Sequence, residues 1–226
     1  MKLKNKTRLG YTEKDMADAF LELLQSPGSL PEIGPFDRVF REVSCRQGRP
    51  DFIALRHNED FQLPTYPESI GIVGPAILSL LKPNASRTLR YLVNNTEFSE
   101  DSIKRSLNQL VNYSHVERIN TNSYRLANNA THAKIELWVF ELKLDNPKRA
   151  VFQAMQSRTY SNHSIIVIPP SQEKYYKRYI VPMKRWGIGL ATFDPNSVKF
   201  CMLRRGRTSR SLNVQHKIYA LSQICI

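Results

Sequence analysis

The stretch from Ile135 to Leu144 constrains the fold more than any other, because it is mostly apolar on both faces of a β-strand. Successive side chains of a strand point to opposite faces of the sheet, so such a strand is covered on both sides. This is typical of an α/β sheet flanked by helices. Near its end, Glu141 and Lys143 share one face. Burying a carboxylate and an ammonium there costs free energy unless each has an interaction partner or a functional role.

The residues that follow predict a sheet with parallel strands. Asn146 and Pro147 form a typical helix start. After them the expected elements are helix 148–160, strand 165–168, helix 172–186, strand 187–193 and strand 198–203. The alternation of strands and helices favours parallel strands joined by right-handed crossovers.

The residues before position 57 predict a helix and a hairpin. Thr12 is a typical N-cap for a helix that begins at Glu13 and stops before Pro27. Two β-leaning runs, 38–43 and 51–55, are separated by a turn that contains glycine and proline. Asp51 would open the second strand of this hairpin.

Residues 69–128 predict a small domain inserted into a core made of residues 1–68 and 129–226. A polar, proline-rich link leads into three helical patterns and two short β runs. Three helices closed by a hairpin resemble a winged helix-turn-helix domain. The resemblance implies that the third helix, over 99–113, reads DNA through its outward polar side chains: Lys104, Arg105, Asn108, Gln109 and Asn112. A helical bundle with solvated charges is the alternative.

With the inserted domain set aside, the order of elements resembles the PD-(D/E)xK nuclease superfamily. Pro50-Asp51 matches the PD half of the motif, and Glu141-Leu142-Lys143 matches the ExK half. The resemblance implies an α/β fold, namely a restriction-endonuclease-like mixed sheet flanked by helices and interrupted by the small winged-helix (α+β) domain. The inserted domain would account for the long interval between the two halves.

The resemblance also implies a Mg²⁺-dependent DNA endonuclease, with Mn²⁺ as a substitute metal. A divalent cation neutralises charge on the phosphodiester and makes bound water acidic enough to attack it. Magnesium prefers hard oxygen ligands, which Asp51, Glu141 and the carbonyl of Leu142 could provide. Lys143 would orient or deprotonate the water, or stabilise the developing charge. The alternative is a structural salt bridge in a fold that has lost its activity.

Two further catalytic residues follow from the resemblance. Many members carry a glutamate in the first helix that reaches the metal, and Glu13 or Glu22 would fill that place. Members related to recombination nucleases carry a glutamine in the helix after ExK, where Gln153 stands. As ordinary alternatives, Glu13 is a first-turn carboxylate favoured by the helix dipole and Gln153 is a solvated surface residue.

Composition agrees with a nucleic-acid partner. The 226-residue chain has a formal net charge of +13, and such a charge attracts polyanions. Nucleic acid is the first candidate, and an anionic membrane surface is the second. No apolar run approaches the roughly 20 residues that cross a bilayer, so no membrane association is expected. Cys45, Cys201 and Cys225 are odd in number and widely spaced, as is typical of reduced thiols in a cytoplasmic protein. Restriction-like cores often pair to cut both strands, which favours a homodimer.

Two other functions are compatible with the same residues. A non-catalytic DNA-binding regulator could keep the nuclease-like core as a scaffold, and the winged helix could instead serve protein assembly. The nuclease hypothesis has one structural condition that the others lack. Asp51, Glu141 and Lys143 must meet at one end of the sheet.

Overall fold

The computed structural model describes residues 10–57, 63–67, 70–127, 135–208 and 210–225. These residues form two compact units, each assembled from separate parts of the chain. Unit 1 contains the described residues of Met1–Val43, Gln47–Arg56 and Glu136–Ser211. Unit 2 contains those of Ser44–Arg46, His57–Ile135 and Leu212–Ile226. No described helix is both long enough and apolar enough to cross a membrane.

Unit 1 is built on a mixed six-stranded sheet with the order β1-β2-β6-β7-β8-β9. The strands are β1 (Arg38–Arg41), β2 (Phe52–His57), β6 (Ile135–Leu142), β7 (His163–Ile168), β8 (Gly189–Asp194) and β9 (Lys199–Arg204). The central strands β6, β7 and β8 are parallel, whereas β1 and β9 pair antiparallel with their neighbours at the edges. The mixed α/β sheet and the 38–55 hairpin expected from the sequence are confirmed.

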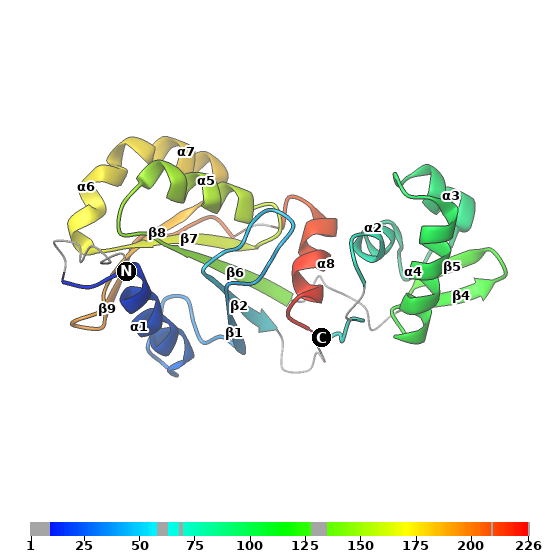
Figure 1. Ribbon diagram of the computed structural model, residues 1–226, viewed down its shortest axis with the longest axis horizontal. Helices are drawn as coiled ribbons and strands as arrows, with labels where there is room; N and C mark the ends of the chain where they lie inside the picture. Colours follow the sequence, from blue (N-terminus) through cyan, green and yellow to red (C-terminus); the bar gives the residue numbers. More distant parts are fainter. Residues whose placement is uncertain (1–9, 58–62, 68–69, 128–134, 209, 226) are drawn as a thin grey trace, which may run out of the picture. The chain divides into compact units, whose positions relative to one another are not determined.

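Helices cover both faces of this sheet (Figure 1). The helix α1 (Glu13–Gln25) packs on one face, where Phe20 contacts Phe52, Phe140 and Phe193 at ring-centroid distances of 5.3–5.9 Å. The helices α5 (Pro147–Ser157), α6 (Glu173–Tyr176) and α7 (Ile180–Trp186) lie on the other face. The strand β6 is therefore buried from both sides, as its apolar pattern predicts.

Two helix starts are set by local hydrogen bonds that the sequence predicts. The Thr12 hydroxyl accepts from the Asp15 amide at 3.2 Å, and the Asp15 carboxylate accepts from the Thr12 amide at 2.8 Å, which forms a capping box for α1. The Asn146 side chain accepts from the Arg149 amide at 3.1 Å, and Pro147 occupies the first turn of α5. These caps fix where α1 and α5 begin, and the first turn of α1 carries Glu13, which lies 3.2 Å from Lys143.

The prediction of a single helix over 172–186 is wrong. The chain there forms η2 (Pro170–Gln172), α6, η3 (Lys177–Tyr179) and α7 in succession. Pro182 explains the break, because proline has no amide hydrogen to donate and its ring clashes with the carbonyl four residues earlier. Pro182 is tolerated near the start of α7, where no intrahelical partner would exist for its amide.

Unit 2 contains the three helices and the hairpin expected between residues 69 and 128. Its elements are α2 (Val73–Leu80), β3 (Arg87–Thr88), α3 (Leu89–Asn94), α4 (Glu100–Asn112), β4 (Val116–Asn120), β5 (Ser123–Leu126) and α8 (Val214–Ser222). The second of these helices, α3, begins at Leu89, because Arg87 and Thr88 pair with β5 and the Thr88 hydroxyl caps the helix. The strands form a sheet with the order β3-β5-β4.

The segment 212–226 was expected in the core, but its described residues belong to unit 2. The helix α8, which the sequence did not predict, packs on α2 and fully buries Ile218 and Leu221. The backbone amide of Tyr66 also donates to the carbonyl of Cys225 at 2.7 Å. The correction has a simple reason. The apolar face of α8 is covered within unit 2, together with residues 63–67 that precede the expected boundary.

Candidate active site

Asp51 and Lys143 meet at the end of β6. Asp51 stands immediately before β2, and Lys143 immediately after β6, its neighbour in the sheet. The backbone amide of Leu142 donates to Asp51 Oδ2 at 2.7 Å, and Lys143 Nζ lies 3.3 Å from the same oxygen. The two halves of the motif, far apart in the sequence, therefore share one end of the sheet.

Lys143 is the centre of the site. Its ammonium donates to Asp51 Oδ2, to Glu13 Oε1 at 3.2 Å and to the carbonyl of Leu142 at 2.6 Å. Burial lowers the pKa of Lys143, but the charges of Asp51, Glu13 and Glu141 outweigh burial and hold this pKa above its usual value. Lys143 is consequently an ammonium at neutral pH, and it compensates the carboxylates around it.

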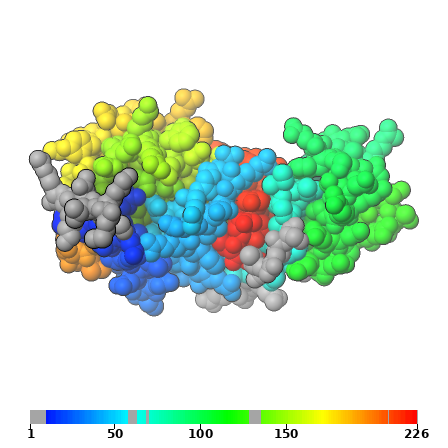
Figure 2. Space-filling model, viewed as in Figure 1, coloured from blue at the N-terminus to red at the C-terminus, as the bar shows by residue number. Residues whose placement is uncertain are grey.

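Of the two candidate carboxylates on the first helix, the structure brings Glu13 to Lys143. The capping box fixes the first turn of α1, from which Glu13 projects. Glu22 lies near the other end of the helix with an exposed side chain. Glu13 and Asp51 also line an open cleft of about 400 Å³, where α1 and the β1–β2 hairpin lie side by side (Figure 2).

Glu141 is the least compensated group of the site. Only 2% of the residue is exposed, and its Oε2 atom has no hydrogen-bond partner among the described residues. Burial, with smaller contributions from the charges of Asp51 and Glu13, raises the pKa of Glu141 to about 8, although Lys143 and the Ser157 hydroxyl oppose the rise. At neutral pH the side chain holds its proton, and an arriving cation would favour its release.

Gln153 stands on α5, the helix that covers the Glu141 face of the sheet. Its side chain is partly buried, and Oε1 has no hydrogen-bond partner among the described residues. Its backbone carbonyl accepts from the Ser157 hydroxyl at 3.1 Å. None of its described contacts reaches Asp51, Glu141 or Lys143, so the geometry links Gln153 to the site only through the helix that carries it.

The oxygen atoms of the site suit a hard cation, although they do not form a complete set of metal ligands. No three His, Cys, Asp or Glu side chains within the described part of the chain are grouped to hold a metal. Asp51 and the carbonyl of Leu142 already accept from Lys143. Glu141, however, offers an unpaired buried oxygen, which is rare unless it has a ligand to meet. Asp51, Glu141 and the Leu142 carbonyl therefore fit Mg²⁺ or Mn²⁺ by donor chemistry.

The residues expected to contact DNA lie on the surface of α4. Lys104, Arg105, Asn108 and Asn112 are exposed, and Gln109 is partly buried. Lys104 forms an ion pair with Glu100 at 2.6 Å, whereas Arg105 lies 3.5 Å from the Ser102 hydroxyl. The residues of the Lys104–Glu100 ion pair are one turn apart on a solvated helix face, so the pair contributes little to stability. Lys104 could therefore exchange Glu100 for a phosphate at small cost.

The structure also groups polar residues that the sequence did not single out. Arg56, Glu136, Trp138 and His163 line a cavity on the α1 side of the sheet, at the opposite end of β6 from Lys143. Glu136, a carboxylate inside an apolar strand, is the one signal in the sequence that could have indicated them.

The arrangement at the end of β6 can bind a divalent cation and present an ammonium beside it. A cation and an ammonium placed together can stabilise negative charge that develops on oxygen atoms. This chemistry is supported by the geometry of four residues: Glu13, Asp51, Glu141 and Lys143. No protein-family model matches the chain, and no curated protein matches it.

Proposed function

We propose that the protein is a Mg²⁺-dependent DNA endonuclease with a restriction-endonuclease-like core. The observation that carries the proposal is the convergence of Glu13, Asp51 and Glu141 around Lys143 at one end of the sheet. The mixed sheet, with α1 on one face and α5 on the other, supports the same core.

Each residue has a distinct role in this proposal. Asp51, Glu141 and the carbonyl of Leu142 would hold the cation, which supplies charge neutralisation and an acidic bound water. Lys143, as an ammonium, orients that water or stabilises the charge that develops on the phosphate. Glu13 holds the ammonium through its 3.2 Å contact. Gln153 remains a candidate for contacting the substrate.

The elements of unit 2 support a DNA-docking role of the winged-helix type. The helix α4 would lie in the major groove, where Asn108, Gln109 and Asn112 could contact base edges, and Lys104 and Arg105 could contact phosphates. The β4–β5 hairpin would serve as the wing. The net charge of +13 supplies attraction that does not depend on sequence.

The first test incubates supercoiled and linear DNA with the protein, with Mg²⁺ and with EDTA. The wild-type protein should nick or linearise DNA only with the metal. Asp51→Asn should lower the rate by about 100-fold or more, because it weakens both the cation site and the contact with Lys143. Glu22→Gln removes an exposed carboxylate on the same helix as Glu13 and should leave the rate unchanged.

One observation favours a non-catalytic DNA-binding regulator as the second candidate. Lys143 already compensates Asp51 and Glu13, so this cluster is stable without any metal. The regulator predicts that wild-type protein cleaves no DNA with Mg²⁺ or Mn²⁺, and that Asp51→Asn binds DNA as the wild type does. Both results together would replace the nuclease proposal with the regulator.

DNA binding through α4 predicts a change in affinity and in its salt dependence. The double substitution Lys104→Gln with Arg105→Gln should weaken duplex binding by about 10-fold at low salt and lower the slope of log K against log salt by about 2. The measurement is fluorescence anisotropy over a range of salt concentrations. Lys174→Gln with Lys177→Gln removes the same charge from an exposed surface of unit 1 and should have a smaller effect.

If both double variants behave alike, net charge and not α4 governs binding. If the wild-type protein binds DNA weakly and with little salt dependence, the protein-assembly role for unit 2 becomes the better explanation.

A further inference from the structure

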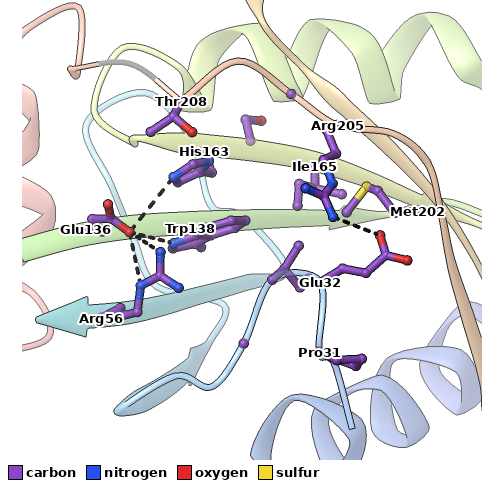
Figure 3. A pocket seen from close by; sticks show the side chains of 14 residues that line it. Pro31, Glu32, Arg56, Glu136, Trp138, His163, Ile165, Met202, Arg205 and Thr208 are labelled. Carbon is purple, nitrogen blue, oxygen red and sulfur yellow. Dashed lines mark hydrogen bonds and ion pairs between the residues drawn. The ribbon is translucent and has the colours of Figure 1, made fainter. Parts of the chain in front are cut away.

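A cavity of about 350 Å³ opens on the α1 side of the unit 1 sheet, near the start of β6 (Figure 3). Its apolar lining includes Ile33, Ile165 and Met202, and charged and polar residues near them in the chain also line it. Because it lies at the opposite end of β6 from Lys143, the proposed nuclease chemistry does not use it. Its size falls within the range of small-ligand sites.

One wall of the cavity is a carboxylate held in a fixed orientation. Arg56 donates to Glu136 Oε2 through Nε at 3.1 Å and Nη2 at 2.6 Å, and Trp138 Nε1 lies 3.4 Å from the same oxygen. All contacts of Glu136 drawn in Figure 3 end on this one oxygen. Among the described residues, the second oxygen, Oε1, is left to accept from a ligand.

His163 forms the adjacent part of this wall. Its ring stacks on Trp138 with a centroid distance of 3.5 Å and an interplanar angle of 12°. Burial lowers the pKa of His163 to about 4, so the imidazole is neutral at pH 7. Its Nε2 is buried and has no hydrogen-bond partner among the described residues. A neutral imidazole nitrogen in this state can give or accept one hydrogen bond with a ligand.

The opposite side of the cavity carries a loosely held cation. Arg205 lies 3.9 Å from Glu32, and its side chain is 73% exposed. Such a pair contributes little to stability, so the guanidinium can turn toward a ligand at small cost. Figure 3 shows Arg205 and Glu32 across the cavity from the Glu136–Arg56 pair.

The charges that line the cavity exclude some ligands. Arg56 and Arg205 are balanced by Glu32 and Glu136, and His163 is neutral. A phosphate group would meet no net positive charge there, and its charge would face two carboxylates. The lining suits a neutral, flat ring that donates hydrogen bonds on one edge and accepts them on another.

We propose that this cavity binds a guanine base. Guanine presents adjacent N–H donors on its Watson–Crick edge, which match the free oxygen of Glu136, and its O6 and N7 acceptors match the fork of Arg205. Adenine presents an unprotonated ring nitrogen where guanine carries N1–H, and that lone pair would face the carboxylate. The apolar side chains of Ile165 and Met202 would contact the ring face.

The base could come from a free guanine nucleoside or from a base that leaves the stack of DNA. Titration of the protein with guanosine, adenosine or cytidine tests the first source, followed by tryptophan fluorescence. Trp186→Phe leaves Trp138 as the sole reporter. Guanosine should quench this fluorescence saturably, with an affinity at least about 10-fold higher than that of adenosine.

Arg205→Ala should weaken guanosine binding by about 10-fold, whereas Arg207→Ala, an exposed arginine of the same segment outside the cavity lining, should not. Arg205 is so exposed that its removal leaves folding intact. Glu136→Gln should weaken binding as well, and circular dichroism verifies that this variant, which loses a partner of Arg56, is folded.

The second source is tested with duplexes that carry one bulged guanine or one bulged adenine, in EDTA so that no cleavage occurs. Preference for the bulged guanine, lost in Arg205→Ala, indicates an extruded DNA base, and preference for guanosine alone indicates a free nucleoside. Absence of guanine selectivity in both arms would overturn the proposal. Neither arm measures cleavage, so its failure is separate from that of the nuclease proposal.

Discussion

Lys143→Ala is expected to lower the rate of DNA cleavage by about 100- to 1,000-fold. The substitution removes the ammonium that contacts Asp51 and Glu13 and that would meet the charge developing on the phosphate. The measurement is single-turnover cleavage of supercoiled DNA at saturating Mg²⁺. Lys148→Ala, an exposed lysine on the neighbouring helix, should cleave at the wild-type rate.

The same variant distinguishes a metal site from a structural salt bridge. When Lys143 is removed, the carboxylates of Asp51 and Glu13 lose their compensating charge, so the metal-free variant should be less stable than the wild type. Added Mg²⁺ should then raise its melting temperature more than that of the wild type. Destabilisation that Mg²⁺ does not reverse, together with full cleavage activity, would contradict the role given to Lys143.

Glu141→Gln is expected to change how stability depends on pH in the absence of metal. In the folded protein, burial raises the pKa of Glu141 from 4.5 to about 8, so the folded state keeps a proton that the unfolded chain releases. The unfolded state binds fewer protons between these values, and the free energy of unfolding therefore falls as pH rises from about 5 to 8. The fall should amount to roughly a few kcal/mol, and glutamine, which stays neutral, should abolish it.

Urea unfolding at pH 5 and pH 8 in EDTA measures this difference, with exposed Glu173→Gln as the control. In the presence of Mg²⁺ the same ionisation has the opposite consequence. The cation requires the carboxylate, so Mg²⁺ affinity should rise with pH up to about 8, with release of a proton. Equal pH dependence of stability in wild type and Glu141→Gln would show that Glu141 is ionised throughout.

Local signals explain how much of unit 1 could be predicted from the sequence. Thr12 and Asn146 indicate helix starts, because each caps its helix through a hydrogen bond to an amide three residues later in the chain. The two-sided apolar pattern of β6 predicts its central place in the sheet. The meeting of Asp51 with Lys143 depended on the resemblance to a nuclease core, because no local pattern joins residues so distant in the chain.

What the sequence did not predict depends on long-range packing. The helix α8 has a weak apolar pattern, and its position is decided by α2. Arg56, Glu136 and His163 come from three strands and gain meaning only once β2, β6 and β7 are neighbours. The raised pKa of Glu141 is caused mainly by burial. The extent of burial depends on the packed structure and cannot be read from the residue type.

The interleaving of the two units has a consequence for synthesis on the ribosome. Unit 1 cannot pair β2 with β6 until the residues of unit 2 between them have been translated, and unit 2 cannot complete its core until α8 follows the whole of unit 1. Neither unit can therefore finish folding before translation of the other begins. The apolar faces of α2 and β2 stay uncovered meanwhile, which makes this chain a candidate for chaperone assistance during its synthesis.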